Sequence, residues 1–273
     1  TLTSIRVPDV HGRLGEVTLG LRSLEDYVAG NPFLGSTVGR YANRLAKGQL
    51  TIDGRTIALA QNNNGNHLHG GLRALDKRIW KSEAFRTADA SAVRFTYVSP
   101  DGEEGYPGTL SVTVTYALAD AADELTIDFA ATTDAPTACN LTNHVFFNLA
   151  GQASILDHRV TLRSDRLVTV TPALIPTGEF MDVTNTPFDF RRAHAIGERI
   201  GAPHDQLRRA RGYDHCYDLG ADQSLKSAAF VTEASSGRTL EVLTDAPGLQ
   251  FYTGNFLTGT EIGRASCRER VSS

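Results

Sequence analysis

Side chains suited to proton transfer and to binding a small molecule gather in four short segments of the sequence: GRYANRLAKG, GNHLHGG, CNLTNHVFFNLAG and RGYDHCYDLG. Their polar residues are Arg40, Asn43 and Arg44; His67 and His69; Thr142, Asn143, His144 and Asn148; and Asp214 and His215. Histidine is the natural side chain for moving protons near neutral pH. None of the segments has the spacing of a metal-binding helix, a phosphate-binding loop or a nucleophile elbow. Polar groups on separate loops can converge on one pocket, so the sequence favours a small-molecule site that handles protons.

Each of these residues also has an ordinary structural explanation. Arg40 and Arg44 could be surface charges, and His69 could be a turn residue because a pair of glycines follows it. His144 could be a core histidine whose ring nitrogens are both hydrogen-bonded, and Asp214 could cap a turn. Taken singly, each is more often structural; taken together, they favour a functional site.

Strands are the elements expected to position these residues. Apolar and polar side chains alternate over residues 92–99, 110–118, 124–133 and 159–170, which is typical of half-buried strands. Asp53-Gly54 and Ser236-Gly237 lie between paired runs and predict hairpin turns. Residues 191–200 are the only stretch that resembles a helix. Helix–strand alternation is missing, so the sequence predicts an all-β fold, a large antiparallel sandwich forming a single domain over residues 1–260.

Composition narrows the possible partners. The net charge is −4, whereas nucleic-acid binding requires a basic surface. No run approaches the roughly 20 apolar residues of a membrane helix, so neither nucleic acid nor a membrane is expected as a partner. Cys139, Cys216 and Cys267 are too scattered for a disulfide framework or a zinc site, and the first two are expected to be small buried apolar residues.

The two ends of the sequence look unusual. The chain opens without Met, inside a strand-like pattern, and has no signal peptide, which indicates a cytoplasmic protein with part of its start missing. The residues after Thr260 show no apolar periodicity, and IGRASCRERV is what one frame of a common sequencing-adaptor oligonucleotide would encode. Residues 261–273 are therefore expected to be a non-native tail.

Several longer segments resemble the aldose 1-epimerase (galactose mutarotase) family, in the family's order and at about its spacing, from Leu2 to Thr260. They read VGRYANRLAKG, NHLHGG, PDGEEGYPG, TNHVFFNLAG, LIPTGEF, TPFDFR, GYDHCYDL and PGLQFYTGNFL. The resemblance implies an antiparallel β-sandwich that interconverts the α and β anomers of a free aldose, a hexose such as galactose or glucose. It implies no metal and no cofactor, because the reaction needs only two proton transfers.

The resemblance also implies roles for individual residues. His144 corresponds to the general acid of the family, and His69 to a histidine beside the ring oxygen and the anomeric centre. Both imidazoles could steady charge on the departing ring oxygen. The residues expected to bind the sugar are Asn43, Arg44, His69, His144, Phe146, Asp214 and Gln250.

Two departures from the family pattern affect these expectations. Relatives often have Tyr-Phe-Asn where this chain has Phe146-Phe147-Asn148, so a tyrosine hydroxyl is absent, and the aromatic rings could pack on a sugar or belong to the core. The family's general base is a glutamate C-terminal to FYTGNF. Glu261 lies too close to that segment to take the role. The chain is therefore expected to have an acid and a pocket without its base, and to be impaired.

Three alternatives remain open on the sequence. A sugar-binding protein would keep Arg44 and Asp214 without needing two histidines. A hexose-phosphate epimerase would need extra cations, for which Arg73, Lys77 and Arg78 are candidates. A polysaccharide hydrolase or lyase would need a carboxylate pair or a lyase base, which no motif supplies.

Overall fold

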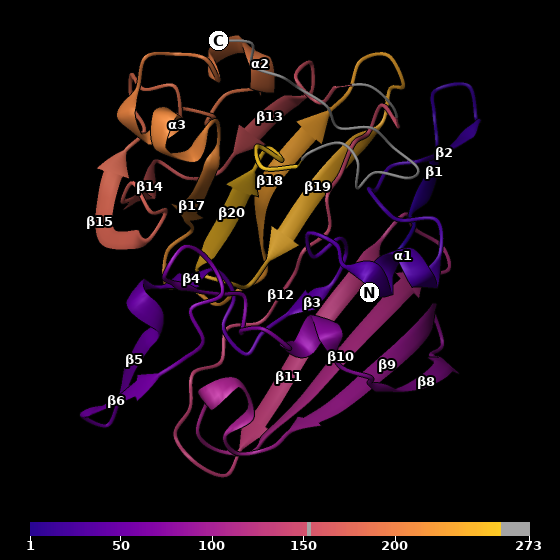
Figure 1. The fold of residues 1–273 in the computed structure, drawn as a ribbon. Coiled ribbons are helices and arrows are strands. Elements are labelled where there is room, and N and C mark those ends of the chain that lie inside the picture. Colours follow the sequence, from indigo (N-terminus) through magenta and orange to yellow (C-terminus); the bar gives the residue numbers. More distant parts are fainter. Residues whose placement is uncertain (152–153, 258–273) are drawn as a thin grey trace. The chain divides into compact units, whose positions relative to one another are not determined.

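The structure is a computed structural model that describes residues 1–151 and 154–257; Figure 1 draws its elements. The chain forms two compact units, a larger one of residues 1–36 with the segment from His144 onward, and a smaller one of residues 37–143. Strands dominate both, and the ladders between named strands in the described residues run antiparallel. The all-β prediction is thus confirmed. One domain over residues 1–260 stays a prediction, and the expected tail at 261–273 lies outside the described residues.

The larger unit contains two four-stranded sheets with the strand orders β16-β13-β18-β19 and β15-β14-β17-β20 (Figure 1). Their strands are β13 (Arg159–Leu162), β14 (Arg166–Val170), β15 (Pro176–Asp182), β16 (His194–Ala195), β17 (Asp214–Asp218), β18 (Lys226–Thr232), β19 (Thr239–Thr244) and β20 (Gly248–Tyr252). The unit also holds β1 (Arg6–Pro8), β2 (Leu14–Glu16), α1 (Leu24–Ala29), α2 (Ile196–Arg199) and α3 (Asp205–Ala210).

Buried side chains from both sheets form one apolar core, as expected for a sandwich. Leu162 from β13, Leu167 from β14 and Tyr217 from β17 are each at most 1% exposed, and Phe251 from β20 packs against them. Successive side chains of a strand point to opposite faces of the sheet. In β17, His215 and Tyr217 are therefore buried, while Asp214 and Cys216 lie on the other face and are only half-buried.

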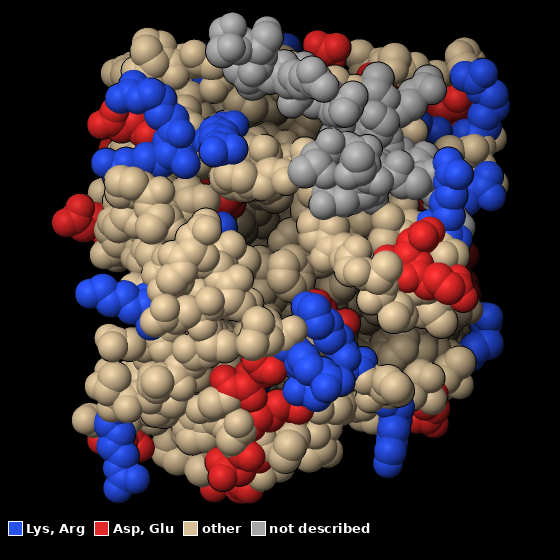
Figure 2. Space-filling view, viewed as in Figure 1, with Lys and Arg blue, Asp and Glu red and all other residues tan. Residues whose placement is uncertain are grey.

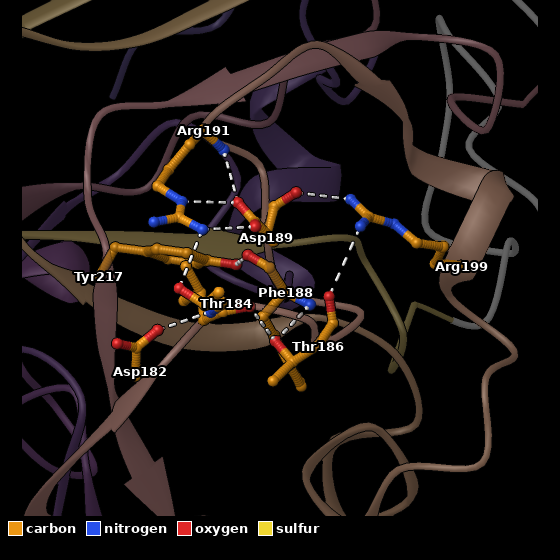
Figure 3. Close-up of polar contacts among 9 residues, drawn as sticks. Asp182, Thr184, Thr186, Phe188, Asp189, Arg191, Arg199 and Tyr217 are labelled. Carbon is orange, nitrogen blue, oxygen red and sulfur yellow. Dashed lines mark hydrogen bonds and ion pairs between the residues drawn. The ribbon is translucent and has the colours of Figure 1, made fainter.

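The TPFDFR segment contributes Phe188 and Phe190 to this core. Figure 3 shows the polar contacts that hold the segment in place. Arg191 donates from Nε to Oδ1 of Asp189 at 2.9 Å and from Nη2 to Oδ2 at 2.7 Å. Arg199 donates to the Asp189 carbonyl at 2.6 Å, and the Tyr217 hydroxyl donates to the Phe188 carbonyl at 3.0 Å. These bonds hold the loop against β17, the strand that carries Asp214, so the segment supports the fold.

The smaller unit is built around one four-stranded sheet of order β11-β10-β9-β8 (Figure 1). On β10, Leu110, Val112 and Val114 point to the buried face, as their alternation predicted. The predicted hairpin turn is confirmed, because Asp53 and Gly54 both have positive φ, at 49° and 75°. The elements are β3 (Thr37–Val38), β4 (Arg44–Leu45), η1 (Ala46–Gly48), β5 (Gln49–Ile52), β6 (Arg55–Ala58), β7 (His67–Leu68), η2 (Leu75–Lys77), β8 (Lys81–Arg86), β9 (Ala90–Ser99), η3 (Glu103–Gly105), β10 (Leu110–Ala119), β11 (Leu125–Thr133) and β12 (Thr142–Asn143).

Two expectations were wrong. The helix near residues 191–200 exists as α2, but α1 and α3 are also helical. Each of those has six residues, too few to repeat an apolar period. Cys139 was expected to be buried and is exposed, and Cys216 is only half-buried; both are free thiols.

Candidate functional site

The face of β17 and β20 away from the core carries a hydrogen-bonded polar pair. Asp214 is paired with Tyr252 and Cys216 with Gln250 in the antiparallel register. Because side chains two residues apart share a face, Asp214, Gln250 and Tyr252 lie on the same side. The Gln250 amide donates from Nε2 to Oδ1 of Asp214 at 2.7 Å. The pair therefore presents a carboxylate held in one orientation.

An aromatic row joins this pair to His144. The His144 ring lies 4.9 Å from the Phe146 ring, centroid to centroid, and Phe146 lies 5.8 Å from Tyr252. On its other side, the His144 ring lies 5.8 Å from Phe33. Phe146 also packs against the buried pair Leu19 and Leu34. The structure thus gathers His144, Phe146, Asp214 and Gln250 in the larger unit; that they belong to one sugar site stays a prediction.

The backbone fixes the position of His144. Its N–H donates to the carbonyl of Ser36 at 2.9 Å, and its carbonyl accepts from the N–H of Gly35 at 2.9 Å. The following chain is held in the same way, because Leu19 donates to the carbonyl of Phe146 at 3.0 Å. Hydrogen bonds therefore hold the backbone on both sides of the His144 side chain. Proton transfer at a defined atom requires such positioning.

The second group lies in the smaller unit, where β4 pairs with β7. Arg44 is opposite Leu68 in this ladder. At the end of the ladder, the N–H of His69 donates to the carbonyl of Asn43, and the N–H of Asn43 donates to Nδ1 of His69, both at 3.1 Å. Arg44 donates from Nε to Oδ1 of Asn63 at 3.2 Å. The structure thus brings His69, Asn43 and Arg44 together.

The bond from Asn43 sets the tautomer of His69. In a neutral imidazole one ring nitrogen is an acceptor and the other carries the proton. Nδ1 of His69 accepts the Asn43 N–H, so the ring proton is on Nε2. His69 therefore presents an N–H donor on the side of the ring away from Asn43, which suits an oxygen that gains negative charge.

His67 and His215, also named from the sequence, have structural roles. His67 is fully buried; its Nδ1 donates to the Ala60 carbonyl at 2.8 Å, and its Nε2 accepts from the Tyr106 hydroxyl at 2.6 Å. Burial lowers its pKa. His215 is fully buried too, and burial, with a smaller effect of His204, lowers its pKa to about 4. Both imidazoles are neutral members of the core.

Arg40 was offered as a surface charge, and the structure corrects this. It is 2% exposed. Its guanidinium donates to the carbonyls of Ser99, Pro100 and Gly108, each at 2.8 Å. Arg40 therefore anchors the PDGEEGYPG loop and binds no ligand through these donors.

Sequence reasoning missed Tyr252, which lies between Phe146 and the Asp214–Gln250 pair. The signal was present, because Tyr252 is two residues after Gln250 on the same strand and so shares its face. It also missed Asn62 and Glu104, which bind the backbone of the His69 turn; Asn62 does so from six to nine positions away and Glu104 from about 30. Among residues 1–151 and 154–257, no group of three His, Cys, Asp or Glu side chains is placed to hold a metal. No helix in the same ranges has the length and apolar character to cross a bilayer.

Known proteins match the chain over nearly all its length. A family model described as aldose 1-epimerase matches residues 1–272. The galactose mutarotase of Sus scrofa is 45% identical over 97% of this chain and 75% of its own length. The aldose 1-epimerase of Escherichia coli (strain K12) is 41% identical over 95% and 74%. The crystal structure of galactose 1-epimerase from Lactobacillus acidophilus NCFM matches with a TM-score of 0.83 and 30% identity, over 95% of this chain and 76% of that one. The chain therefore belongs to the aldose 1-epimerase family.

Proposed function

We propose that the chain interconverts the α and β anomers of a free aldose and that His144 is its general acid. The observation that carries the proposal is the row in the larger unit, where a histidine with a fixed backbone lies beside aromatic rings and the Asp214–Gln250 pair. Relatives named galactose mutarotase support galactose as the first substrate to test, with glucose second. The proposed partner is a small sugar, with no cofactor, nucleic acid or membrane.

The reaction is a balanced exchange of protons. Protonated His144 gives its proton to the ring oxygen as the bond from that oxygen to C1 breaks, and a base takes the proton of the anomeric hydroxyl. C1 becomes an aldehyde, rotation about C1–C2 exposes its other face, and the same transfers in reverse close the ring. The Nε2–H of His69 donates to an oxygen at the anomeric centre and stabilises its developing charge. We assign no residue among 1–151 and 154–257 as the base. Water therefore accepts this proton in this chain, and we expect exchange to be slower than in a relative that has its glutamate.

The remaining residues bind hydroxyl groups. The carboxylate of Asp214, oriented by Gln250, accepts hydrogen bonds from sugar hydroxyls. Asn43 and Arg44 contribute amide and guanidinium donors. Phe146 offers a ring face to the C–H side of the sugar.

Exchange NMR on the whole chain tests the proposal. Magnetisation transfer between the H1 protons of α- and β-galactose measures the rate of interconversion, and saturation-transfer difference measures binding. We expect His144→Gln to slow exchange by about 10²–10⁴-fold and to keep sugar binding. His11→Gln is the matched control, because His11 is an exposed histidine of the same unit.

Two results would overturn the proposal. One is a His144→Gln variant that exchanges anomers within twofold of the parent chain. The other is a parent chain that binds the sugar and adds nothing to the rate of the uncatalysed reaction; the sugar-binding alternative would then replace the enzyme.

The hexose-phosphate alternative is less well supported. Of its candidate cations, Arg78 pairs with Glu103 at 3.0 Å and Lys77 with Asp76 at 2.7 Å. Acidic and basic side chains are interspersed on the face drawn in Figure 2. Cations already paired with carboxylates are poor phosphate ligands, so these observations favour a free sugar.

A further inference from the structure

The turn that carries His69 holds this residue in a backbone conformation that is unfavourable for a non-glycine residue. Three successive residues have positive φ: His69 at 52°, Gly70 at 90° and Gly71 at 115°. A non-glycine residue in this region is uncommon and persists only where its surroundings hold it. Something outside the turn must therefore keep His69 in place.

Glu104 holds the turn from one end. One carboxylate oxygen, Oε2, accepts the N–H of Leu72 at 2.7 Å, and the other, Oε1, accepts the N–H of Arg73 at 2.9 Å. The Glu104 carboxylate also fills the space that a Cβ on Gly71 would need. Its side chain is 14% exposed. Both oxygens are thus engaged with the backbone directly after the His69-Gly70-Gly71 turn.

Asn62 holds the turn at both ends. Its Oδ1 accepts the N–H of Leu68 at 2.8 Å, and its Nδ2 donates to the carbonyls of Leu68 and Gly71, both at 3.0 Å. Leu68 and Gly71 flank the same two residues, His69 and Gly70. The turn is therefore clamped by two side chains of different chemistry.

The loop that carries Glu104 is itself anchored. Arg40 binds the carbonyls of Ser99 and Gly108, at the two ends of the loop. The Tyr106 hydroxyl donates to Nε2 of His67, two residues before His69. Glu104 therefore binds the turn from a loop that is itself anchored.

We propose that Glu104 is a positioning residue for His69. Its carboxylate fork holds the left-handed turn, the turn keeps Nδ1 of His69 on the Asn43 N–H, and that bond keeps the ring proton on Nε2. The catalytic consequence rests on the proposed function, whereas the effect on the tautomer of His69 does not. Glutamine in place of Glu104 turns one acceptor into an NH₂ group facing a backbone N–H, so one of the two bonds is lost.

Nitrogen-15 NMR of the histidine rings reads the tautomer directly in the whole chain. In the parent we expect the His69 ring in the Nε2–H form at pH 8, and in Glu104→Gln a mixture of both tautomers. We further expect kcat for anomer exchange to fall by about 10–100-fold with a smaller change in KM, because a misplaced group impairs the chemical step. Glu104→Asp keeps the charge but has a shorter side chain. Its tautomer ratio and its kcat should lie between those of the parent and those of Glu104→Gln.

Glu83→Gln is the matched control, because Glu83 is an exposed glutamate of the same unit and should leave tautomer and rate unchanged. If Glu104→Gln does not fold, Asn62→Asp provides the second variant, since it removes both amide donors from the other clamp and should give the same tautomer mixture.

The outcomes separate the two proposals. A mixed tautomer in Glu104→Gln, absent from Glu83→Gln, supports the positioning role even where the parent chain does not exchange anomers, which would count only against the proposed function. A folded Glu104→Gln variant with the parent's tautomer and rate overturns the positioning role.

Discussion

Gln250 donates its side-chain N–H to the Asp214 carboxylate at 2.7 Å across the β17–β20 ladder. The register makes this possible, because Gln250 is opposite Cys216 and its amide reaches diagonally to the residue two positions away. The bond fixes the direction of the Asp214 carboxylate. A charged acceptor in a fixed direction suits sugar hydroxyls, which need well-oriented partners.

Replacing Asp214 with Asn is therefore expected to weaken sugar binding. A hydrogen bond to a charged group contributes about 1.5–3 kcal/mol, so we expect the KM for galactose to rise by roughly 10–100-fold. Titration of the sugar followed by exchange NMR measures KM and kcat separately.

Asp218→Asn is the control for this prediction. Asp218 lies on the same strand and the same face, and pairs with the half-exposed Arg166. We expect its KM to stay within about twofold of the parent's. Equal effects of the two substitutions would contradict the assignment of Asp214.

The buried His215 predicts a loss of stability in mild acid. Its pKa is lowered from 6.5 to about 4, so below pH 6.5 the unfolded chain binds a proton that the folded chain does not. The free energy of unfolding should therefore fall between pH 6.5 and pH 4, by about 3 kcal/mol from this residue. Urea unfolding followed by far-UV circular dichroism at several pH values measures the slope.

His215→Gln should flatten that slope while lowering stability at pH 8, since the imidazole also bonds Gln206 at 3.1 Å. His11→Gln, an exposed site, should preserve the slope. A slope that is the same in His215→Gln and in the parent would show that this histidine does not cause it.

Replacing Arg40 is expected to cause a large loss of stability in the smaller unit. Arg40→Met leaves several buried carbonyls without donors, at about 1–3 kcal/mol for each, so we expect a loss of at least about 3 kcal/mol. Arg94→Met, on an exposed arginine paired with Glu83 at 3.4 Å, should cost less than about 1 kcal/mol. Trp80, the one tryptophan of the sequence, lies in this unit and reports its unfolding by fluorescence. Similar midpoints for the two variants would refute the anchoring role of Arg40.

The strands and the turn at Asp53-Gly54 were predictable because both follow from local patterns. Alternation fixes which face of β10 is buried, and an Asp-Gly pair favours the positive φ that the hairpin needs. His144, Phe146, Asp214 and Gln250 were nominated together from the family resemblance, and their role in one site stays a prediction.

The roles of Arg40 and Glu104 were not predictable, because a sequence does not show which distant carbonyls or amides a charged side chain will meet. Arg40 binds carbonyls about 60 positions away, and Glu104 binds amides about 30 positions away. His67 and His69 are two residues apart in one motif, yet burial separates a core histidine from a candidate catalytic one. Tertiary packing alone decides such cases.

Gly70 gives a last prediction that separates backbone strain from steric contact. A Cβ on Gly70 would collide with the carbonyl oxygen of Gly39, whereas a Cβ on Gly54 meets nothing within 4 Å. Both glycines have positive φ, at 90° and 75°, so Ala at either site pays a similar conformational cost of about 1 kcal/mol. Gly70→Ala must also move the backbone beside His69. We expect it to lower the unfolding midpoint of Trp80 fluorescence clearly more than Gly54→Ala, and to reduce the anomer exchange rate at least tenfold. Gly54→Ala should leave exchange unchanged, because its turn is remote in sequence from the His69 turn; equal effects on rate would mean that the close approach of Gly70 does not matter for His69.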